Sequence, residues 1–220
     1  MSTKLTNAGP AESVLFDSPV VRQSAQLSDR RLFFKKFLAK GREISSAVPS
    51  SGAMVSGILR HVQFGHPSTI VELGAGTGPV TERILARLRP HHRFIAVEND
   101  PDFCRVLRRK FPKLHLLESD ATSLVEPFER MGLDDEVDYV ISGLPTPNLT
   151  PKGMVRLWKW LRSVLSPQGV FIQITVAPLV YRGFYARLFE QVEYRMVWRN
   201  VPPGGIYRCT RPRRHLRKPA

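Results

Sequence analysis

Three glycines at alternate positions form the part of the sequence best suited to binding a ligand. They follow an apolar segment, 68–73, and the turn reads Gly74-Ala75-Gly76-Thr77-Gly78. Residues without a Cβ allow a chain to turn tightly and a ligand to approach its backbone closely. Pro79 stands where a dinucleotide-binding turn has its third glycine, and the acidic Glu72 before the turn would repel a phosphate. The turn therefore favours a ligand with a cationic amino-acid group.

Two further acids follow the next two expected strands. Glu98 ends the segment 94–98, where an acid binds the hydroxyls of a ribose, and Asp120 follows 114–118, where it accepts from an adenine amine. A glycine turn alone is weak evidence, but together with these acids it indicates S-adenosylmethionine. The alternatives are an NAD enzyme and a doubly wound sheet with ordinary acids at its strand ends. The expected cofactor-binding residues are Glu72, Gly74, Ala75, Gly76, Thr77, Gly78, Glu98, Asn99, Asp120, Ala121 and Ser142.

The segment 142–148, here called the exit segment, leaves the fourth expected strand. It reads Ser142-Gly143-Leu144-Pro145-Thr146-Pro147-Asn148. Ligands of such sheets bind at the carboxyl ends of the strands, so we expect this segment to line the pocket of the methyl acceptor. Small residues and prolines make it rigid and allow close approach to the sulfonium. The alternative is a proline-rich strand exit that binds no ligand.

Polar and aromatic groups near the exit segment are candidates for holding the acceptor. Methyl transfer is an in-line displacement that needs a neutral amine at near-attack distance, and the sequence shows no obvious general base. Tyr181 and Tyr185 lie four residues apart on one helix face and could stabilise a cationic product. Core packing is the alternative for both tyrosines, and it is the favoured interpretation for Trp158. The expected acceptor-site residues are Leu144, Pro145, Asn148, Tyr181 and Tyr185.

Alternating strands and helices must position these residues. The alternation predicts an α/β, Rossmann-like class I methyltransferase domain with a seven-stranded, mostly parallel sheet that a C-terminal antiparallel hairpin closes. The expected strands are 68–73, 94–98, 114–118, 137–142, 169–175, 191–200 and 205–209. The expected helices are 52–61, 79–88, 101–111, 152–165 and 181–189.

Composition places this domain within a soluble chain. We expect a flexible segment at 1–27, helices at 28–62, the methyltransferase domain at 63–209 and a basic tail at 210–220. No apolar run approaches the length of a membrane span, and the first residues do not resemble a signal peptide. Cys104 and Cys209 have no metal-ligand spacing, so we expect reduced thiols and a cytoplasmic protein. The scattered histidines support neither a zinc site nor a catalytic triad.

Positive charge gathers near the two ends of the chain. The net charge is +14, of which 29–42 carries +5 and 208–218 carries +6. A basic protein usually binds nucleic acid or an anionic membrane. In an expected helix, four apolar side chains fall within an arc of roughly 140° and lysines lie outside it. The expected membrane-binding residues are Phe33, Phe34, Lys35, Lys36, Phe37, Leu38 and Lys40, and packing of this helix on the core is the alternative.

From about residue 32 to 208 the chain resembles the bacterial phospholipid N-methyltransferases, which are related to the ribosomal RNA adenine dimethylases. The most discriminating motifs are Ala47-Val48-Pro49-Ser50-Ser51, Ser142-Gly143-Leu144-Pro145 and Arg199-Asn200-Val201-Pro202-Pro203.

The resemblance implies stepwise methylation of phosphatidylethanolamine by an enzyme peripherally bound to the inner face of the membrane. Arg182, beside the two tyrosines, is a candidate for binding a lipid phosphate, and a solvent-exposed arginine is the alternative. RNA adenine methylation is the first alternative, although Thr146 stands where the dimethylases have an aromatic that stacks on the target base. The second alternative is a non-catalytic protein that binds the cofactor and a partner.

Overall fold

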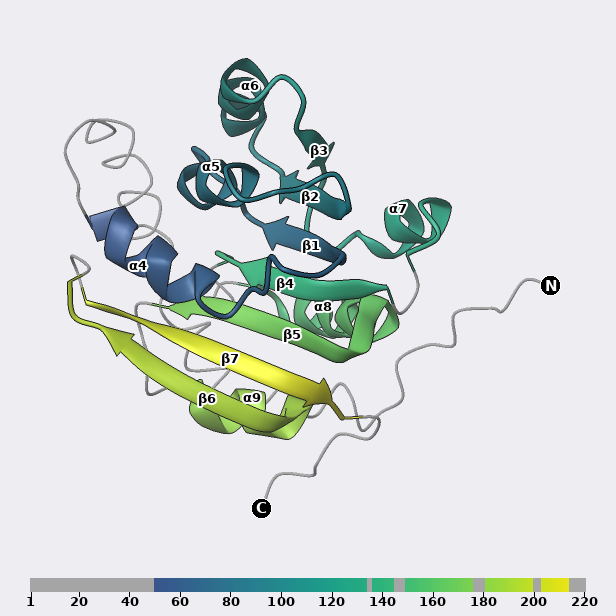
Figure 1. Ribbon diagram of the computed structural model, residues 1–220. Coiled ribbons are helices and arrows are strands. Elements are labelled where there is room, and N and C mark those ends of the chain that lie inside the picture. The colour runs from purple at the N-terminus through teal and green to yellow at the C-terminus, as the bar shows by residue number, and fades with distance from the viewer. Residues whose placement is uncertain (1–49, 134–135, 145–148, 176–180, 200–202, 214–220) are drawn as a thin grey trace.

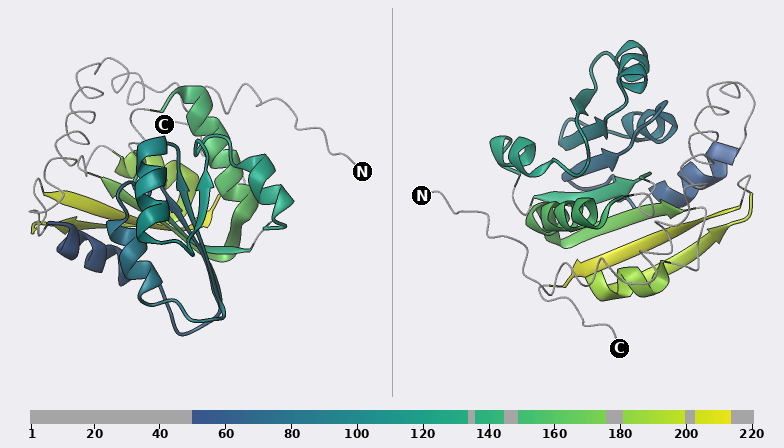
Figure 2. Two further views of the ribbon diagram at one scale, coloured as in Figure 1. Left: turned by 90° about the horizontal axis from the view of Figure 1, so that it is seen from above. Right: turned by 180° about the vertical axis from the view of Figure 1, so that it is seen from behind.

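The computed structural model describes residues 50–133, 136–144, 149–175, 181–199 and 203–213, which form one sheet with helices on both sides (Figures 1 and 2). The strand order is β3-β2-β1-β4-β5-β7-β6. Neighbours from β3 to β5 are parallel, and β7 is antiparallel to both β5 and β6, which confirms the predicted fold. The strands are β1 (Ser68–Leu73), β2 (His92–Glu98), β3 (His115–Glu118), β4 (Val137–Ser142), β5 (Leu165–Thr175), β6 (Phe189–Val197) and β7 (Gly204–Pro212).

Each face of the sheet buries an apolar layer under helices. One layer joins α4, α5 and α6 to strand residues that include Ile70 and Ile172. The other joins α7, α8 and α9 to the opposite face, which includes Val71 and Phe171. Burial on both faces explains why the central strands are continuous apolar runs. The helices are α4 (Ser50–Leu59), α5 (Pro79–Leu85), α6 (Pro101–Lys110), α7 (Val125–Arg130), α8 (Pro151–Val164) and α9 (Arg182–Leu188).

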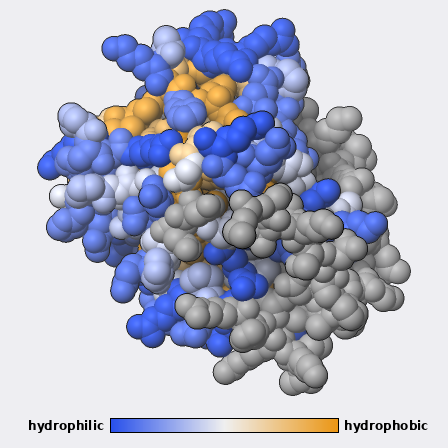
Figure 3. Space-filling model, turned by 90° about the vertical axis from the view of Figure 1, so that its right-hand side faces the viewer, coloured by the Kyte–Doolittle hydropathy of each residue, from blue (hydrophilic) through white to orange (hydrophobic). Residues whose placement is uncertain are grey.

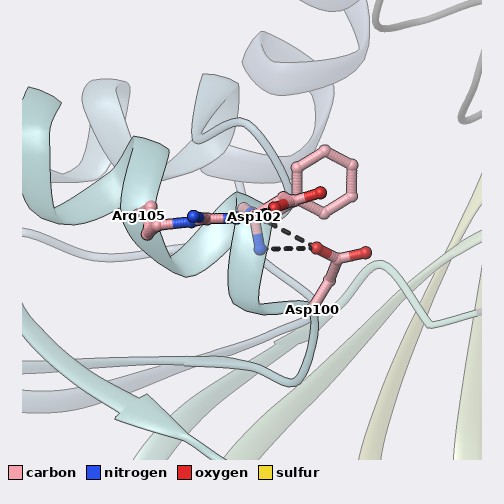
Figure 4. Close-up of polar contacts among 4 residues, drawn as sticks. Asp100, Asp102 and Arg105 are labelled. Atoms are coloured by element: carbon pink, nitrogen blue, oxygen red, sulfur yellow. Dashed lines mark hydrogen bonds and ion pairs between the residues drawn. The ribbon is translucent and has the colours of Figure 1, made fainter.

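Local capping determines where the helices after β2 and β4 begin. The Asp100 side chain accepts hydrogen bonds from the backbone of Asp102 at 2.8 Å and of Phe103 at 3.2 Å (Figure 4). The Thr150 hydroxyl accepts from the Gly153 amide at 3.1 Å. Both caps are followed by a proline at the first helical position, where a missing N–H costs nothing. The chain therefore turns sharply soon after β2 ends.

Several boundaries differ from the predictions. The helix expected to reach 88 ends at Leu85, because a tighter turn precedes Pro90, which cannot continue a helix. The six-residue α7 was not predicted, since it is too short to show a helical period. Strand β5 begins at Leu165, directly after α8, and β7 continues to Pro212, within the expected basic tail. The expected helix at Phe33–Lys40 lies outside the described residues.

The segments expected to bind ligands lie at one edge of the sheet. The parallel strands β1, β4 and β5 end toward the left of Figure 1. The β6–β7 connection lies at this same edge, because Thr175 pairs with Gly205 and Val197 pairs with Gly204. We call it the carboxyl edge. The opposite side of the molecule has a mostly hydrophilic described surface with one apolar area (Figure 3). Within the described segments, no helix is long and apolar enough to cross a membrane.

Candidate active site

The glycine turn after β1 has the backbone geometry that its sequence predicts. Gly74, Gly76 and Gly78 have φ angles of 74°, 57° and 88°, all in the left-handed region that disfavours a Cβ. The amides of Gly74 and Ala75 donate to the carbonyl of Val97 at 2.9 and 3.2 Å. These bonds attach the turn to the end of β2, so the two expected ligand-binding segments form one unit.

The three glycines have different surroundings. A Cβ at Gly78 would lie 2.7 Å from Phe111 Cε2, so this glycine allows the turn to pack against the end of α6. A Cβ at Gly74 would lie 3.2 Å from Leu144 Cδ2 in the exit segment. A Cβ at Gly76 would meet nothing within 4 Å. The backbone at Gly76 therefore borders open space that a ligand can occupy, which fits the expected cofactor.

Glu98 connects the end of β2 to this turn. One carboxylate oxygen, Oε2, accepts from the Gly76 amide at 2.8 Å. The other, Oε1, accepts from the amides of Asn99 and Asp100, each at 2.9 Å. A carboxylate has about four acceptor positions, and Glu98 uses one of them for the glycine turn and two for the chain that follows β2. Its prediction as a ribose ligand is compatible with this position beside Gly76.

Glu72 lies inside the protein rather than on the open side of the turn. Its side chain is buried, and its Oε2 accepts from the Thr81 hydroxyl at 2.6 Å in the first turn of α5. Burial raises the pKa of Glu72 to about 8, and the Thr81 hydrogen bond opposes this rise. The structure thus gives Glu72 a partner that the sequence analysis missed. Its expected interaction with a cationic amino-acid group stays a prediction.

The remaining expected cofactor residues gather at the same edge. Asp120 follows β3, where its exposed carboxylate accepts from the Thr122 amide at 2.6 Å, and Ala121 beside it is buried. Asn99 is exposed next to Glu98. The Thr77 carbonyl accepts from Lys110 Nζ at 3.0 Å, a contact that no local sequence signal indicates.

The exit segment begins directly beside the glycine turn. The Gly143 amide donates to the carbonyl of Leu73 at 2.9 Å, which extends the pairing of β1 with β4 by one residue. Ser142 is fully buried, and its hydroxyl accepts from the Leu144 amide at 3.4 Å. The expected acceptor residues Pro145 and Asn148 lie outside the described residues. Leu144 is partly exposed and contacts the layer under α8 and α9.

The two expected acceptor tyrosines lie in the core. Tyr181 precedes α9 and is 7% exposed, and Tyr185 within α9 is 2% exposed. The Tyr185 ring lies 5.1 Å from that of Tyr207 on β7 and 6.0 Å from that of Phe171 on β5. This arrangement agrees with the core-packing alternative, while contact with a substrate stays a prediction. Trp158 is buried against Phe189, as the favoured interpretation had it.

Gln173 is a further polar residue that the sequence analysis did not single out. It lies on β5 opposite Ser142 and is 1% exposed. Its Nε2 donates to the carbonyls of Leu144 at 3.0 Å and Ile174 at 2.7 Å. The signal was a lone amide within the apolar run Val170–Ile174. Both cysteines, Cys104 and Cys209, are buried with free thiols.

Comparisons with known proteins agree with this geometry. Residues 70–169 match a methyltransferase domain family. The chain is 40% identical over 187 residues to an ornithine lipid N-methyltransferase of Singulisphaera acidiphila, and the match covers 83% of this chain and 96% of that protein. A ribosomal RNA small subunit methyltransferase A of a Synechococcus species is 38% identical over 80 residues, which cover 35% of this chain and 27% of the relative.

A solved structure shows the same fold. It is the 1,6-didemethyltoxoflavin-N1-methyltransferase of Burkholderia thailandensis with bound 1,6-didemethyltoxoflavin and S-adenosylhomocysteine. It has a TM-score of 0.55 at 16% identity and covers 94% of this chain and 93% of that one.

Proposed function

Because this chain belongs to the S-adenosylmethionine-dependent methyltransferase family that includes the ornithine lipid N-methyltransferase of Singulisphaera acidiphila, we propose that it methylates the amine of a membrane aminolipid. The observation that carries the proposal is that this relative matches over 96% of its own length and 83% of this chain. The Synechococcus and Methanosarcina ribosomal RNA methyltransferases match over about a quarter to a half of their own length, which favours lipid over RNA.

The sequence resemblance and the full-length relative imply two different methyl acceptors. The sequence resemblance implies phosphatidylethanolamine, and the name of the full-length relative implies an ornithine lipid. Both lipids present an amine on a flexible carbon chain, but only the first has a phosphodiester beside it. Arg182, exposed at the start of α9, is the candidate for that phosphodiester. We propose an aminolipid as the acceptor class. Which headgroup is methylated is then determined by experiment.

The chain's own residues account for binding and orientation in this reaction. S-adenosylmethionine, when bound, supplies a methyl group on a cationic sulfur. Glu98 and the glycine turn would hold the nucleoside part, and Asp120 would accept from the adenine amine. The exit segment would position the amine, since the Leu144 side chain and amide nitrogen adjoin the turn and the Leu144 carbonyl accepts from Gln173. Positioning and removal of water are what this displacement requires.

We also propose that the protein works at a membrane surface. The net charge of +14 supports attraction to anionic lipid. Trp198 follows β6 at the carboxyl edge and is 74% exposed, and Arg199 beside it is exposed as well. Tryptophan favours the boundary between headgroups and acyl chains. This position would bring the exit segment close to a lipid headgroup. The basic segment Phe33–Lys40 remains the second proposed contact.

The test is methyl transfer by the purified full chain. Labelled S-adenosylmethionine is incubated with anionic vesicles that contain ornithine lipid, phosphatidylethanolamine or neither, and in parallel with unmodified ribosomal RNA. We expect label in one or both aminolipids and none in RNA. Label in RNA alone would support the adenine methyltransferase alternative. Cofactor binding without transfer to any of these acceptors would contradict the proposal and favour the non-catalytic alternative.

A further inference from the structure

Within the described part of the chain, Gln173 has a buried oxygen without a hydrogen-bond partner. Its Nε2 donates to two carbonyls, those of Leu144 and Ile174, so the orientation of the amide is set by these acceptors. The other amide atom, Oε1, is buried and accepts no hydrogen bond from any residue that the structure describes. Leaving a buried acceptor unpaired is costly, and such groups in folded proteins call for an explanation. A donor supplied by a bound ligand is one such explanation.

The position of Gln173 connects it to the reacting edge of the sheet. Its neighbour on β4 is Ser142, the last residue before the exit segment. Its Nε2 is bonded to the carbonyl of Leu144, whose side chain adjoins Gly74 in the glycine turn. The Gln173 side chain therefore contacts the exit segment directly, at Leu144, and the methyl acceptor is expected at this segment. Gly143 beside Ser142 is exposed, whereas Gln173 Oε1 lies beneath the surface.

The surroundings of Gln173 suit an amine that gains positive charge. Directly opposite on β7 is Tyr207, which is fully buried. Its ring lies 5.1 Å from that of Tyr185 and 5.0 Å from that of Tyr194. Residues opposite each other on antiparallel strands have Cβ atoms about 5 Å apart. An amide oxygen beside aromatic rings offers a hydrogen-bond acceptor and π-faces, and both stabilise an ammonium group.

We propose that Gln173 Oε1 binds the acceptor nitrogen by accepting one of its N–H groups, an inference that rests on the proposed aminolipid activity. The bond leaves the lone pair of the neutral amine directed at the methyl carbon. The N–C bond forms as the S–C bond breaks with its electron pair remaining on sulfur. The resulting ammonium keeps its N–H on Oε1 and releases its proton to water when the product leaves.

The number of methyl groups already on the acceptor amine decides whether it can donate a hydrogen bond to Gln173 Oε1. A neutral primary amine has two N–H groups and a monomethylated amine has one. A dimethylated amine has none, so it cannot donate to Oε1 while its lone pair faces the methyl carbon. Gln173 therefore assists the first and second transfers and gives no hydrogen bond in the third. A residue that merely supports the fold would affect all transfers alike.

The experiment supplies the unmethylated, monomethylated and dimethylated forms of the accepted aminolipid separately to the wild type and to Gln173→Leu. We expect kcat/KM of Gln173→Leu to fall about tenfold or more for the first two acceptors and less than threefold for the third. Gln173→Glu should keep at least a third of the first-transfer activity. Burial favours its neutral form, whose O–H replaces one of the two donated hydrogen bonds and whose carbonyl keeps the acceptor.

Two controls make the outcome decisive. Gln191→Leu makes the same change on exposed β6, where the amide is already bonded to Thr210, and should leave every transfer unchanged. Affinity for S-adenosylhomocysteine, measured by calorimetry, should be equal in all variants. An equal loss in all three transfers, or no loss in Gln173→Leu, would overturn the assignment. A wild type that methylates no aminolipid would overturn the proposed function, and the assignment with it.

Discussion

The Glu72 carboxylate and the Thr81 hydroxyl lie 2.6 Å apart inside the protein, between the end of β1 and the first turn of α5. Burial raises the pKa of Glu72 to about 8. The turn between these two residues is the glycine turn of the candidate cofactor site. The hydrogen bond therefore joins the strand to the helix directly behind that site.

Glu72 should make stability depend on pH. Its folded-state pKa of about 8 exceeds its ordinary value of 4.5, so folding retains a proton that the unfolded chain releases between those values. The stabilisation is complete below about pH 4.5 and is lost as the pH rises through 8. We expect the free energy of unfolding of the wild type to fall relative to Glu72→Gln by ~1.4 kcal/mol per pH unit within this window. Urea unfolding at pH 5.5, 6.5 and 7.5 measures the slope. Parallel pH curves for the wild type and Glu72→Gln would contradict the prediction. The control is Glu190→Gln at an exposed position, whose curve should be parallel to that of the wild type.

Thr81→Val should destabilise the protein more at high pH than at low pH. The variant removes the hydroxyl that donates to Glu72. A hydrogen bond to a neutral carboxyl contributes about 1 kcal/mol, and one to a carboxylate contributes about 1.5–3 kcal/mol. Urea unfolding at pH 6 and at pH 9 should therefore show a larger loss at pH 9. An equal loss at both values would mean that Glu72 does not ionise in this range.

Glu98→Gln should weaken cofactor binding. Three backbone amides donate to the Glu98 carboxylate, and an amide side chain supplies only one acceptor atom. We expect the Kd for S-adenosylhomocysteine in calorimetry to rise at least tenfold and stability to fall by ~2 kcal/mol. Glu118→Gln is the matched control, because Glu118 pairs with Glu98 across the sheet but forms an exposed ion pair with Arg108. Its loss should stay below ~1 kcal/mol. Equal affinities for both variants would remove Glu98 from the cofactor site.

Gly76→Ala and Gly78→Ala should separate binding from stability. Both positions have positive φ, which costs ~1 kcal/mol for alanine. The added methyl at Gly78 also collides with Phe111 and should cost a further ~1–3 kcal/mol. The methyl at Gly76 enters open space, so stability should fall by only this ~1 kcal/mol while affinity for S-adenosylhomocysteine falls about tenfold or more. Unchanged affinity in Gly76→Ala would show that the cofactor does not pass over this residue. Thermal unfolding and calorimetry on the same samples provide both readouts.

Trp198→Ala should reduce membrane binding without affecting folding. The side chain is 74% exposed, so its removal should leave the melting temperature within about 1 °C. Sedimentation with anionic vesicles should show at least a threefold loss of bound protein. Zwitterionic vesicles serve as the control for the charge contribution. Undiminished sedimentation would exclude Trp198 from the lipid contact.

Most of the fold and of the cofactor site could be predicted from the types of residues that are neighbours in the sequence. Strands that are buried on both faces must be apolar throughout, and the tight turn after β1 requires glycines, so both are visible as runs of residue types. The acids Glu98 and Asp120 were predictable because parallel strands end at one edge. Short elements such as α7, and the start of β5 at Leu165, left no periodic pattern to detect.

The sequence by itself determined the α/β class, the order of the elements and the glycine turn with its acids, since each depends on neighbours along the chain. Only the tertiary structure decided which distant groups meet. It brought Thr81 to Glu72, the Gly76 amide to Glu98, and Gln173 to the carbonyl of Leu144, 29 residues away. The reason is physical: each of these contacts joins groups that are separate along the chain and that meet only when strands and helices pack together, which local residue preferences do not encode.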